Sequence, residues 1–309
     1  MTTQNQQQYR LRNWAHYNKA LIVRGSLTLW IDARALDKWL SQERPARPGR
    51  RPTYTDLAVE CCLLLREVYH LPLRATQGLA HSVLRLLSLN LPTPDYSTLS
   101  RRARRLHLPL AAHSTKTIRH LVIDSTGLKV YGEGEWKVRV HGADKRRTWR
   151  KLHISMDAAT HHVTAALLTD KDALDRNSVA TLLQQTEAKI EAVCADGAYD
   201  FEQCYRAIKQ HGAIALIPPR RDAVIRGKSP FEQRDENLRG IDERGRKQWK
   251  KMSGYHQRSL VECAFFRLKA LFSERLRSRR EDTQIMEARI RCVAMNRMSS
   301  LGMPQSYAL

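Results

Sequence analysis

HLVIDSTGLKVYG, residues 120–132, takes an apolar run directly into the acid Asp124. Such a run predicts a buried strand, and a carboxylate at its end is costly unless a partner compensates its charge. A second predicted strand, EAVCADGAYD at 191–200, ends in the same way at Asp196. Turn chemistry accounts for each Asp taken singly, because Asp-Gly and Asp-Ser-x-Gly are common turn sequences. The alternative is that both carboxylates are metal ligands on adjacent strands.

A third segment, GYHQRSLVECAFFRLKALFSERL at 254–276, predicts a long helix from about 255 to 277. At about 100° per residue, four of its polar side chains fall within a stripe roughly 60° wide. These are Tyr255, Arg258, Glu262 and Lys269. Apolar residues dominate the opposite side and are expected to pack on a sheet, which places Glu262 between cations beside the strand ends. The alternative is a solvated face on which Arg258 pairs with Glu262.

The same patterns supply the rest of an α/β core. Two further strands are predicted at 148–157 (TWRKLHISMD) and 161–169 (HHVTAALLT), and a fifth at 213–219 (AIALIPP). Helices are predicted at 175–187 and 202–212. We therefore expect a mixed five-stranded sheet flanked by helices, with its first three strands antiparallel.

Two strand-end Asp and one helix Glu, in this order, form the acidic triad of the ribonuclease-H-like nuclease fold. Oxygen-rich sites of this kind hold Mg²⁺ or Mn²⁺. Two such ions would activate an attacking water or 3′-hydroxyl and stabilise the leaving 3′-oxygen of a phosphodiester. On the second strand, Trp149, Lys151 and His153 share one face by alternation. A metal makes a His general base unnecessary, so His153 is not assigned a catalytic role.

The charge of the chain favours a polyanionic partner. Lys and Arg number 53 against 31 Asp and Glu, a formal net charge of +22. Nucleic acid fits this excess best, because its binding is driven by phosphate neutralisation. A ribosome-associated protein, a membrane-surface protein or charge for solubility are the alternatives.

The cysteines and the hydropathy favour a cytoplasmic location. The six cysteines form no C-x-x-C pair and are expected to be reduced. They are Cys61, Cys62, Cys194, Cys204, Cys263 and Cys292. The N-terminus has no apolar signal region, and no apolar run approaches the roughly 18 residues of a membrane span. We expect a cytoplasmic, nucleoid-associated protein with no membrane partner.

The first 118 residues are predicted to form a helical, basic region. Helices are expected at 55–69, 74–88 and 96–106, with Thr55 and Asp95 as N-cap residues. The third helix follows a Pro-rich turn, as a helix-turn-helix recognition helix does, and a solvated basic face is the alternative. Its arginines, predicted to contact DNA, are Arg101, Arg102, Arg104 and Arg105.

Other segments have two interpretations each. Residues 41–53, rich in Pro and Arg, are either an arm that places Arg50 and Arg51 in a DNA minor groove or an ordinary linker. The charged segment 220–254 is predicted to be a mobile insertion, either gripping DNA or simply solvated. Trp249 and Trp136 either stack on an unpaired base or pack internally. Residues 282–303 predict a closing amphipathic helix, which either covers the core or mediates assembly.

Several motifs in one order resemble the DDE transposases of bacterial insertion sequences, nearly from end to end. Within that family, the chain resembles the branch that has the signature Y-x2-R-x3-E-x6-K. The spacing of this signature is matched by Tyr255, Arg258, Glu262 and Lys269. Further similar stretches are RGSLTLWID, PDYSTLSRRARRL, DSTGLKVYGEGEWKVRVHG, RRTWRKLH, ADGAYD and IPPR. The resemblance implies that Asp124, Asp196 and Glu262 are the catalytic acids and metal ligands.

The resemblance also implies roles for the other residues of the signature. Arg258 and Lys269 would contact phosphates near the cleavage site, and Tyr255 would orient a terminal phosphate or strand. The partners implied are terminal inverted repeats, target DNA and further copies of the chain in a synaptic complex.

These observations together predict an insertion-sequence transposase. It would cleave DNA at the element ends and transfer the 3′-hydroxyl strands into target DNA. Residues 1–118 would bind DNA, and residues 119–309 would form the catalytic domain, with a basic insertion at 220–254 and a C-terminal helix. Two alternatives remain: a related metal nuclease without strand transfer, and a non-catalytic DNA-binding repressor derived from a transposase.

Overall fold

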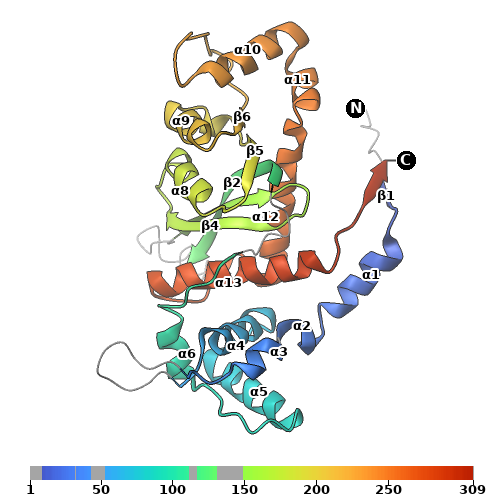
Figure 1. The fold of residues 1–309 in the computed structure, drawn as a ribbon, viewed down its shortest axis with the longest axis vertical. Coiled ribbons are helices and arrows are strands. Elements are labelled where there is room, and N and C mark those ends of the chain that lie inside the picture. The colour runs from blue at the N-terminus through green and yellow to red at the C-terminus, as the bar shows by residue number, and fades with distance from the viewer. Residues whose placement is uncertain (1–8, 32, 43–52, 111–116, 131–148, 309) are drawn as a thin grey trace, which may run out of the picture.

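Six strands in the described part of the chain form one mixed sheet at the centre of the molecule (Figure 1). The computed structural model describes residues 9–31, 33–42, 53–110, 117–130 and 149–308. The strands follow the order β4-β3-β2-β5-β6, and β7 pairs with β2. Their bounds are Thr117–Val130 (β2), Trp149–Asp157 (β3), Val163–Asp170 (β4), Lys189–Cys194 (β5), Ile214–Leu216 (β6) and Arg275–Leu276 (β7).

The strand pairing confirms a mixed sheet whose first three strands are antiparallel. β2 pairs antiparallel with β3, and β3 with β4, whereas β5 and β6 join in parallel. The expected count of five strands is one too low, because β7 forms within the predicted long helix. That helix, α12, covers only Ser259–Phe272, and Ser273 has a φ of +69°, which ends it well before residue 277.

Helices cover both faces of the sheet (Figure 1). Alternate residues of β2 belong to the core clusters of the two faces. Leu121 and Ile123 join the core cluster under α8 (Val179–Gln184) and α9 (Glu202–Gln210). On the other face, Val122 joins the larger core cluster, which includes residues of α12 and of α13 (Glu281–Ser300). Strict alternation therefore decides which β2 side chains reach α12.

The N-terminal part is built from short helices, and its predicted caps are present. Thr55 accepts a hydrogen bond from the Ala58 amide, and Asp95 accepts from the amides of Ser97 and Thr98. The helices are Trp14–Val23 (α1), Leu27–Trp30 (α2), Ala33–Asp37 (α3), Asp56–Val68 (α4), Leu73–Leu86 (α5) and Tyr96–Arg102 (α6). The region is not purely helical, because β1 (Tyr9–Leu11) pairs antiparallel with β8 (Ser306–Ala308).

The C-terminal helix α13 lies between the sheet and the N-terminal helices (Figure 1). One core cluster runs from Trp30 through α4 and the sheet to Met298. Predicted as a closing helix, α13 is buried along most of its length. The domain division at residue 118, where β2 has just begun, stays a prediction. In the described ranges no helix has both the length and the apolar character needed to cross a bilayer.

Residues 220–254 are not the loosely structured insertion that the sequence predicts, because they include α10 (Glu232–Arg244) and α11 (Arg246–Met252). Polar side chains hold α10 in place. Arg234 forms a buried ion pair with Asp200 at 2.9 Å, and Asn237 donates to the Ala215 carbonyl at 2.8 Å. Low apolar content therefore misled the prediction, since the packing here is made by paired polar groups.

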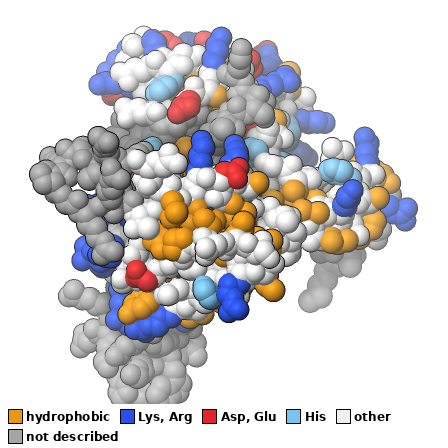
Figure 2. Space-filling model, turned by 60° about the horizontal axis from the view of Figure 1, so that its bottom comes forward, with side chains coloured by type: hydrophobic (Ala, Val, Ile, Leu, Met, Phe, Trp, Pro, Cys, Tyr) orange, Lys and Arg blue, Asp and Glu red, His pale blue; other side chains and the backbone are white. Residues whose placement is uncertain are grey.

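The end of the molecule formed by the N-terminal helices exposes both apolar and basic side chains. Figure 2 turns this end forward and shows hydrophobic side chains gathered in the middle of the face, with Lys and Arg at its edges. Exposed apolar residues of α4, α5 and the following turn include Leu57, Leu86 and Leu87, of which Leu86 is 83% exposed. Within the described ranges, packing therefore leaves part of the helical region uncovered.

Candidate active site

Asp124 lies in the middle of β2, not at the end of a strand as the sequence predicts. The strand continues to Val130 because residues 125–129 keep pairing with β3. The parallel neighbour β5 ends at Cys194, which is opposite Val122. The sheet therefore stops on one side of Asp124, and its carboxylate is 18% exposed. Its Oδ1 accepts from the Ser125 amide at 2.8 Å without forming a turn.

Asp196 lies two residues beyond the end of β5. Continuing the register of Val122 with Cys194 puts it level with Asp124. Its Oδ1 accepts from the Ala198 amide at 2.8 Å and caps the 3₁₀ turn Gly197–Tyr199. The turn interpretation is therefore correct for Asp196 but not for Asp124. One carboxylate oxygen of Asp196 remains for another partner.

Arg258 and Glu262 reach the same place from the start of α12. Arg258 is the last residue of the 3₁₀ turn Tyr255–Arg258, and Glu262 is in the first turn of the helix. The Arg258 guanidinium pairs with Asp124 Oδ2 at 3.2 Å and also with Glu262 Oε1. Arg258 therefore bridges two of the three predicted acids, and the Glu262 side chain is still 56% exposed.

The electrostatics of Asp124 reflect a crowded acidic site. The pKa of Asp124 is raised to about 6, chiefly by burial and to a smaller extent by the nearby charges of Asp196 and Glu262. The Ser125 amide and the Arg258 guanidinium oppose this rise. Such a group of carboxylates favours a bound cation, because a positive charge stabilises every ionised member.

Tyr255, another member of the predicted polar stripe, is buried beside this cluster and interacts electrostatically with Arg258, whereas Lys269 lies farther along α12. Tyr255 is only 6% exposed, and its ring packs against Trp249 with centroids 5.6 Å apart. Burial raises the pKa of Tyr255 to about 12. Lys269 is seven residues beyond Glu262, roughly 10 Å along the helix axis. It is half-buried on α12.

Asp175 is a fourth carboxylate near the site, and sequence analysis missed it. Its Oδ1 accepts from Ser125 Oγ at 2.7 Å and is 3.4 Å from Lys151 Nζ. His153 Nδ1 is 3.5 Å from the same oxygen, and burial lowers the pKa of His153 to about 4. The sequence signal that could have found Asp175 was the shared strand face of Lys151 and His153, because two basic side chains next to each other favour an acid nearby. In sequence, Asp175 resembled an ordinary helix start.

The predicted DNA-binding residues have different surroundings. Arg102 pairs with Asp56 at 2.5 Å and links α6 to α4, so it serves the fold. Arg101, Arg104 and Arg105 are exposed. Trp249 is 6% exposed and has the internal packing that was the alternative to base stacking. Outside the described residues lie Arg50, Arg51 and Trp136.

The donor chemistry of the site fits a divalent cation, but its present arrangement is held by an arginine. Carboxylate oxygens are the ligands that Mg²⁺ and Mn²⁺ prefer. Within the described ranges, no three His, Cys, Asp or Glu side chains are grouped closely enough to hold a metal ion. Arg258 is paired with Asp124 and Glu262. The buried hydroxyl of Tyr199, close to Asp124 and Asp196, has no hydrogen-bond partner in the described part of the chain.

In the comparison with known proteins, two family models with one description match the chain, and one of these matches includes all three predicted acids. Residues 115–297 match a family model described as a transposase DDE domain, and residues 22–133 match a second model with the same description. The first match spans more than half of the chain and includes Asp124, Asp196 and Glu262.

Two solved structures are also similar to the chain. One is a cryo-EM structure of the piggyBac transposase synaptic complex with hairpin DNA, at 9% identity and a TM-score of 0.39, covering 89% of this chain and 75% of that one. The other is the Mos1 transposase paired-end complex with left transposon end, at 11% identity and a TM-score of 0.24, covering 82% of each chain.

Proposed function

Because the chain belongs to the DDE transposase family of DNA-cleaving enzymes, we propose that it is an insertion-sequence transposase. It binds terminal inverted repeats, cleaves DNA at the element ends and transfers the 3′-hydroxyl strands into target DNA. One observation supports the site assignment above all. Asp124, Asp196 and Glu262 come from β2, the turn after β5 and α12, yet Arg258 pairs with the first and the last, and the charges of Asp196 and Glu262 both act on Asp124.

The finer family assignment rests on topology and on the signature residues. A sheet with three antiparallel strands followed by two parallel ones supports a ribonuclease-H-like catalytic domain. The spacing of Tyr255, Arg258, Glu262 and Lys269 supports the Y-x2-R-x3-E-x6-K branch. In this proposal, residues 119–309 are the catalytic domain and residues 1–118 bind DNA.

Asp124, Asp196 and Glu262 are the proposed ligands of two Mg²⁺ ions, for which Mn²⁺ can substitute. When bound, the metal supplies the charge stabilisation that in-line displacement at a phosphodiester requires. The exposed Glu262 side chain and the second oxygen of Asp196 are available for this role. Arg258 is the residue that must give up its carboxylate partners.

Arg258 then has a second role in the proposal. A guanidinium that is released from Asp124 and Glu262 lies beside the site where the scissile phosphate binds, and it offsets charge that develops on that phosphate. Lys269, farther along α12, is proposed to contact the DNA backbone. Tyr255 is buried, so its proposed role is to position the start of α12 and hence Arg258.

The proposed DNA partner is supported by the net charge of +22 and by exposed arginines at the end of α6. Transposition needs two element ends brought together, so we propose that copies of the chain associate in a synaptic complex. Binding of this kind releases counterions, and it is expected to weaken steeply as salt rises.

A strand-transfer assay tests the proposal. The purified full chain is incubated with labelled duplexes that carry the DNA ends flanking the coding region, with Mg²⁺ or with EDTA. Asp124→Asn, Asp196→Asn and Glu262→Gln are each expected to lower nicking by at least about a hundredfold, because even outer partners of metal ligands matter by 10- to 100-fold. Binding of the ends is expected to persist. Asp242→Asn, an exposed acid on α10, is the matched control and is expected to cleave like the parent.

The outcomes separate the alternatives. Nicking without joining identifies a metal nuclease, and end binding without nicking in the parent identifies a repressor. Cleavage by all three variants at the rate of the parent contradicts the assignment of the site.

A further inference from the structure

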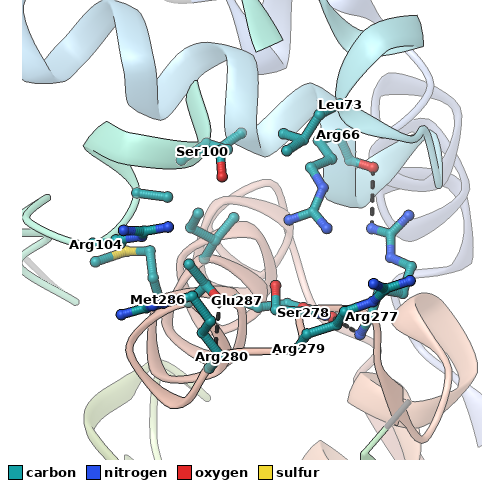
Figure 3. Close-up of a pocket in the computed structure, with 14 residues that line it drawn as sticks. Arg66, Leu73, Ser100, Arg104, Arg277, Ser278, Arg279, Arg280, Met286 and Glu287 are labelled. Atoms are coloured by element: carbon teal, nitrogen blue, oxygen red, sulfur yellow. Dashed lines mark hydrogen bonds between the residues drawn. The ribbon is translucent and has the colours of Figure 1, made fainter. Parts of the chain in front are cut away.

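Five arginine side chains line a pocket that includes none of the three proposed catalytic acids. The pocket has a volume of about 350 Å³ and lies between the N-terminal helices and the segment that leads from β7 into α13. Figure 3 shows arginines from both sides pointing toward the same space. They are Arg66, Arg104, Arg277, Arg279 and Arg280. Sequence analysis predicted DNA contact for the arginines at the end of α6 but assigned no role to the run RLRSRR at 275–280.

The acids near this pocket are engaged within the fold. Glu67 is 1% exposed and pairs with Arg277 at 2.8 Å and with Arg291 at 3.1 Å. Glu287, the acid that lines the pocket, accepts from the amides of Arg277 and Ser278 at 2.8 Å each. The buried Arg291 also pairs with Glu287, at 2.5 Å. These two carboxylates are thus shared among more arginines than they can neutralise.

Three of these arginines, Arg66, Arg104 and Arg280, keep donors for a ligand, and Arg66 also lies 3.4 Å from Glu67. Arg66 Nε is buried and has no hydrogen-bond partner in the described part of the chain. Arg280 is 62% exposed and pairs with Asp282 at 3.0 Å, and Arg104 is 39% exposed and 3.9 Å from the same acid. One half-exposed acid therefore serves two arginines at the mouth of the pocket. An excess of positive charge remains there.

We propose that this arginine pocket binds phosphate groups of the DNA backbone. The planar donor fork of Arg matches the oxygens of phosphates and carboxylates, and several forks around one space favour an anionic ligand over a neutral one. Arg104 connects the pocket to the end of α6, where Arg101 and Arg105 are exposed. The choice of DNA as the source of the phosphate rests on the proposed function. The pocket adds the β7–α13 segment to the DNA-binding surface.

Anisotropy of a labelled duplex at several salt concentrations tests this proposal. The pocket variant Arg104→Gln, Arg279→Gln, Arg280→Gln leaves Arg66 and Arg277 in place, so the contacts of Glu67 are kept. Its slope of log K against log salt is expected to be shallower by about 0.9 for each phosphate contact removed. The control variant Lys189→Gln, Arg206→Gln, Lys209→Gln removes the same charge from exposed positions on β5 and α9, and its slope is expected to stay close to that of the parent.

A charge-preserving variant guards against misfolding. Arg104→Lys, Arg279→Lys, Arg280→Lys is expected to restore most of the salt slope, because point charges remain at the mouth.

Equal slopes for the pocket and control variants would overturn the proposal. Stabilisation of the parent by inorganic phosphate over chloride at equal ionic strength, with no change in the DNA slope of the pocket variant, assigns the pocket to free phosphate and also overturns it. If the parent binds no DNA, the proposed function fails too; if the parent cleaves DNA while the pocket variant matches the control, only the pocket is wrong.

Discussion

Two arginines of this chain each bridge a pair of carboxylates, and their surroundings differ. Arg291 on α13 holds Glu67 and Glu287 with all three side chains at most 1% exposed. Arg258 holds Asp124 and Glu262, which are 18% and 56% exposed, while Arg258 itself is 21% exposed. Arg291 also donates to the carbonyls of Ser273 and Arg275. The buried bridge is thus reinforced by backbone carbonyls and shielded from water, whereas the one at the candidate site faces solvent.

The difference separates a structural bridge from an exchangeable one. A buried charge that loses its partner has no water to replace it, so the Arg291 bridge is costly to open. Exposed pairs contribute little, because water and salt compete with them. Arg258 can therefore release its acids to another cation, as the proposed metal site requires. A third pair, Arg206 with Glu202 on α9, has the same i,i+4 spacing, and its two side chains are 62% and 49% exposed, so its arginine is far more exposed than Arg258.

The largest expected effect is on the buried bridge. Arg291→Leu leaves Glu67 and Glu287 without their main cation and is expected to lower the free energy of unfolding by about 3–5 kcal/mol. Urea denaturation followed by circular dichroism measures this loss. Arg206→Leu removes the matched exposed pair and is expected to cost less than about 0.5 kcal/mol. A loss below about 1 kcal/mol for Arg291→Leu would remove the distinction between the two bridges.

The next largest effect is the stabilisation of the protein by Mg²⁺, and it should depend on the candidate site alone. Mg²⁺ at about 100 times its Kd is expected to stabilise the parent by about 2.7 kcal/mol over the protein in EDTA. Asp196→Asn should abolish this increment while leaving stability in EDTA nearly unchanged. Glu287→Gln should lower the stability in EDTA and keep the Mg²⁺ increment, because it weakens the buried bridge and leaves the metal ligands intact. An increment that survives Asp196→Asn contradicts the proposed ligand set.

Sequence analysis predicted the elements whose signals are local. The apolar β-branched runs gave β2 to β6, and Thr55 and Asp95 cap helices as their chemistry requires. The end of α12 was missed because it depends on the backbone of Ser273, whose φ is +69°. The two-residue strand β7 is too short for any periodic signal, and it forms only because the end of β2 lies beside it.

Contacts between distant residues explain what the sequence could not show. Glu67 and Arg291 are 224 residues apart, and no pattern along the chain pairs them. At the site, helical spacing placed Arg258 and Glu262 on one face, and the structure pairs them. The same stripe did not show that Tyr255 is buried against Trp249. Nor did it reveal Asp175, whose partner Ser125 is 50 residues earlier.

The smallest expected effect is on the exchangeable bridge itself. Arg258→Gln, measured by urea unfolding in EDTA, is expected to change stability by at most about 1 kcal/mol, because water reaches both of its acids. The same variant removes the cation that competes with Mg²⁺ for Asp124 and Glu262. Its stabilisation by Mg²⁺ should therefore appear at a lower Mg²⁺ concentration than in the parent. Arg206→Gln, from the exposed pair on α9, should alter neither quantity. A loss as large as that of Arg291→Leu would make Arg258 a structural residue, and the release of its carboxylates could not be part of the mechanism.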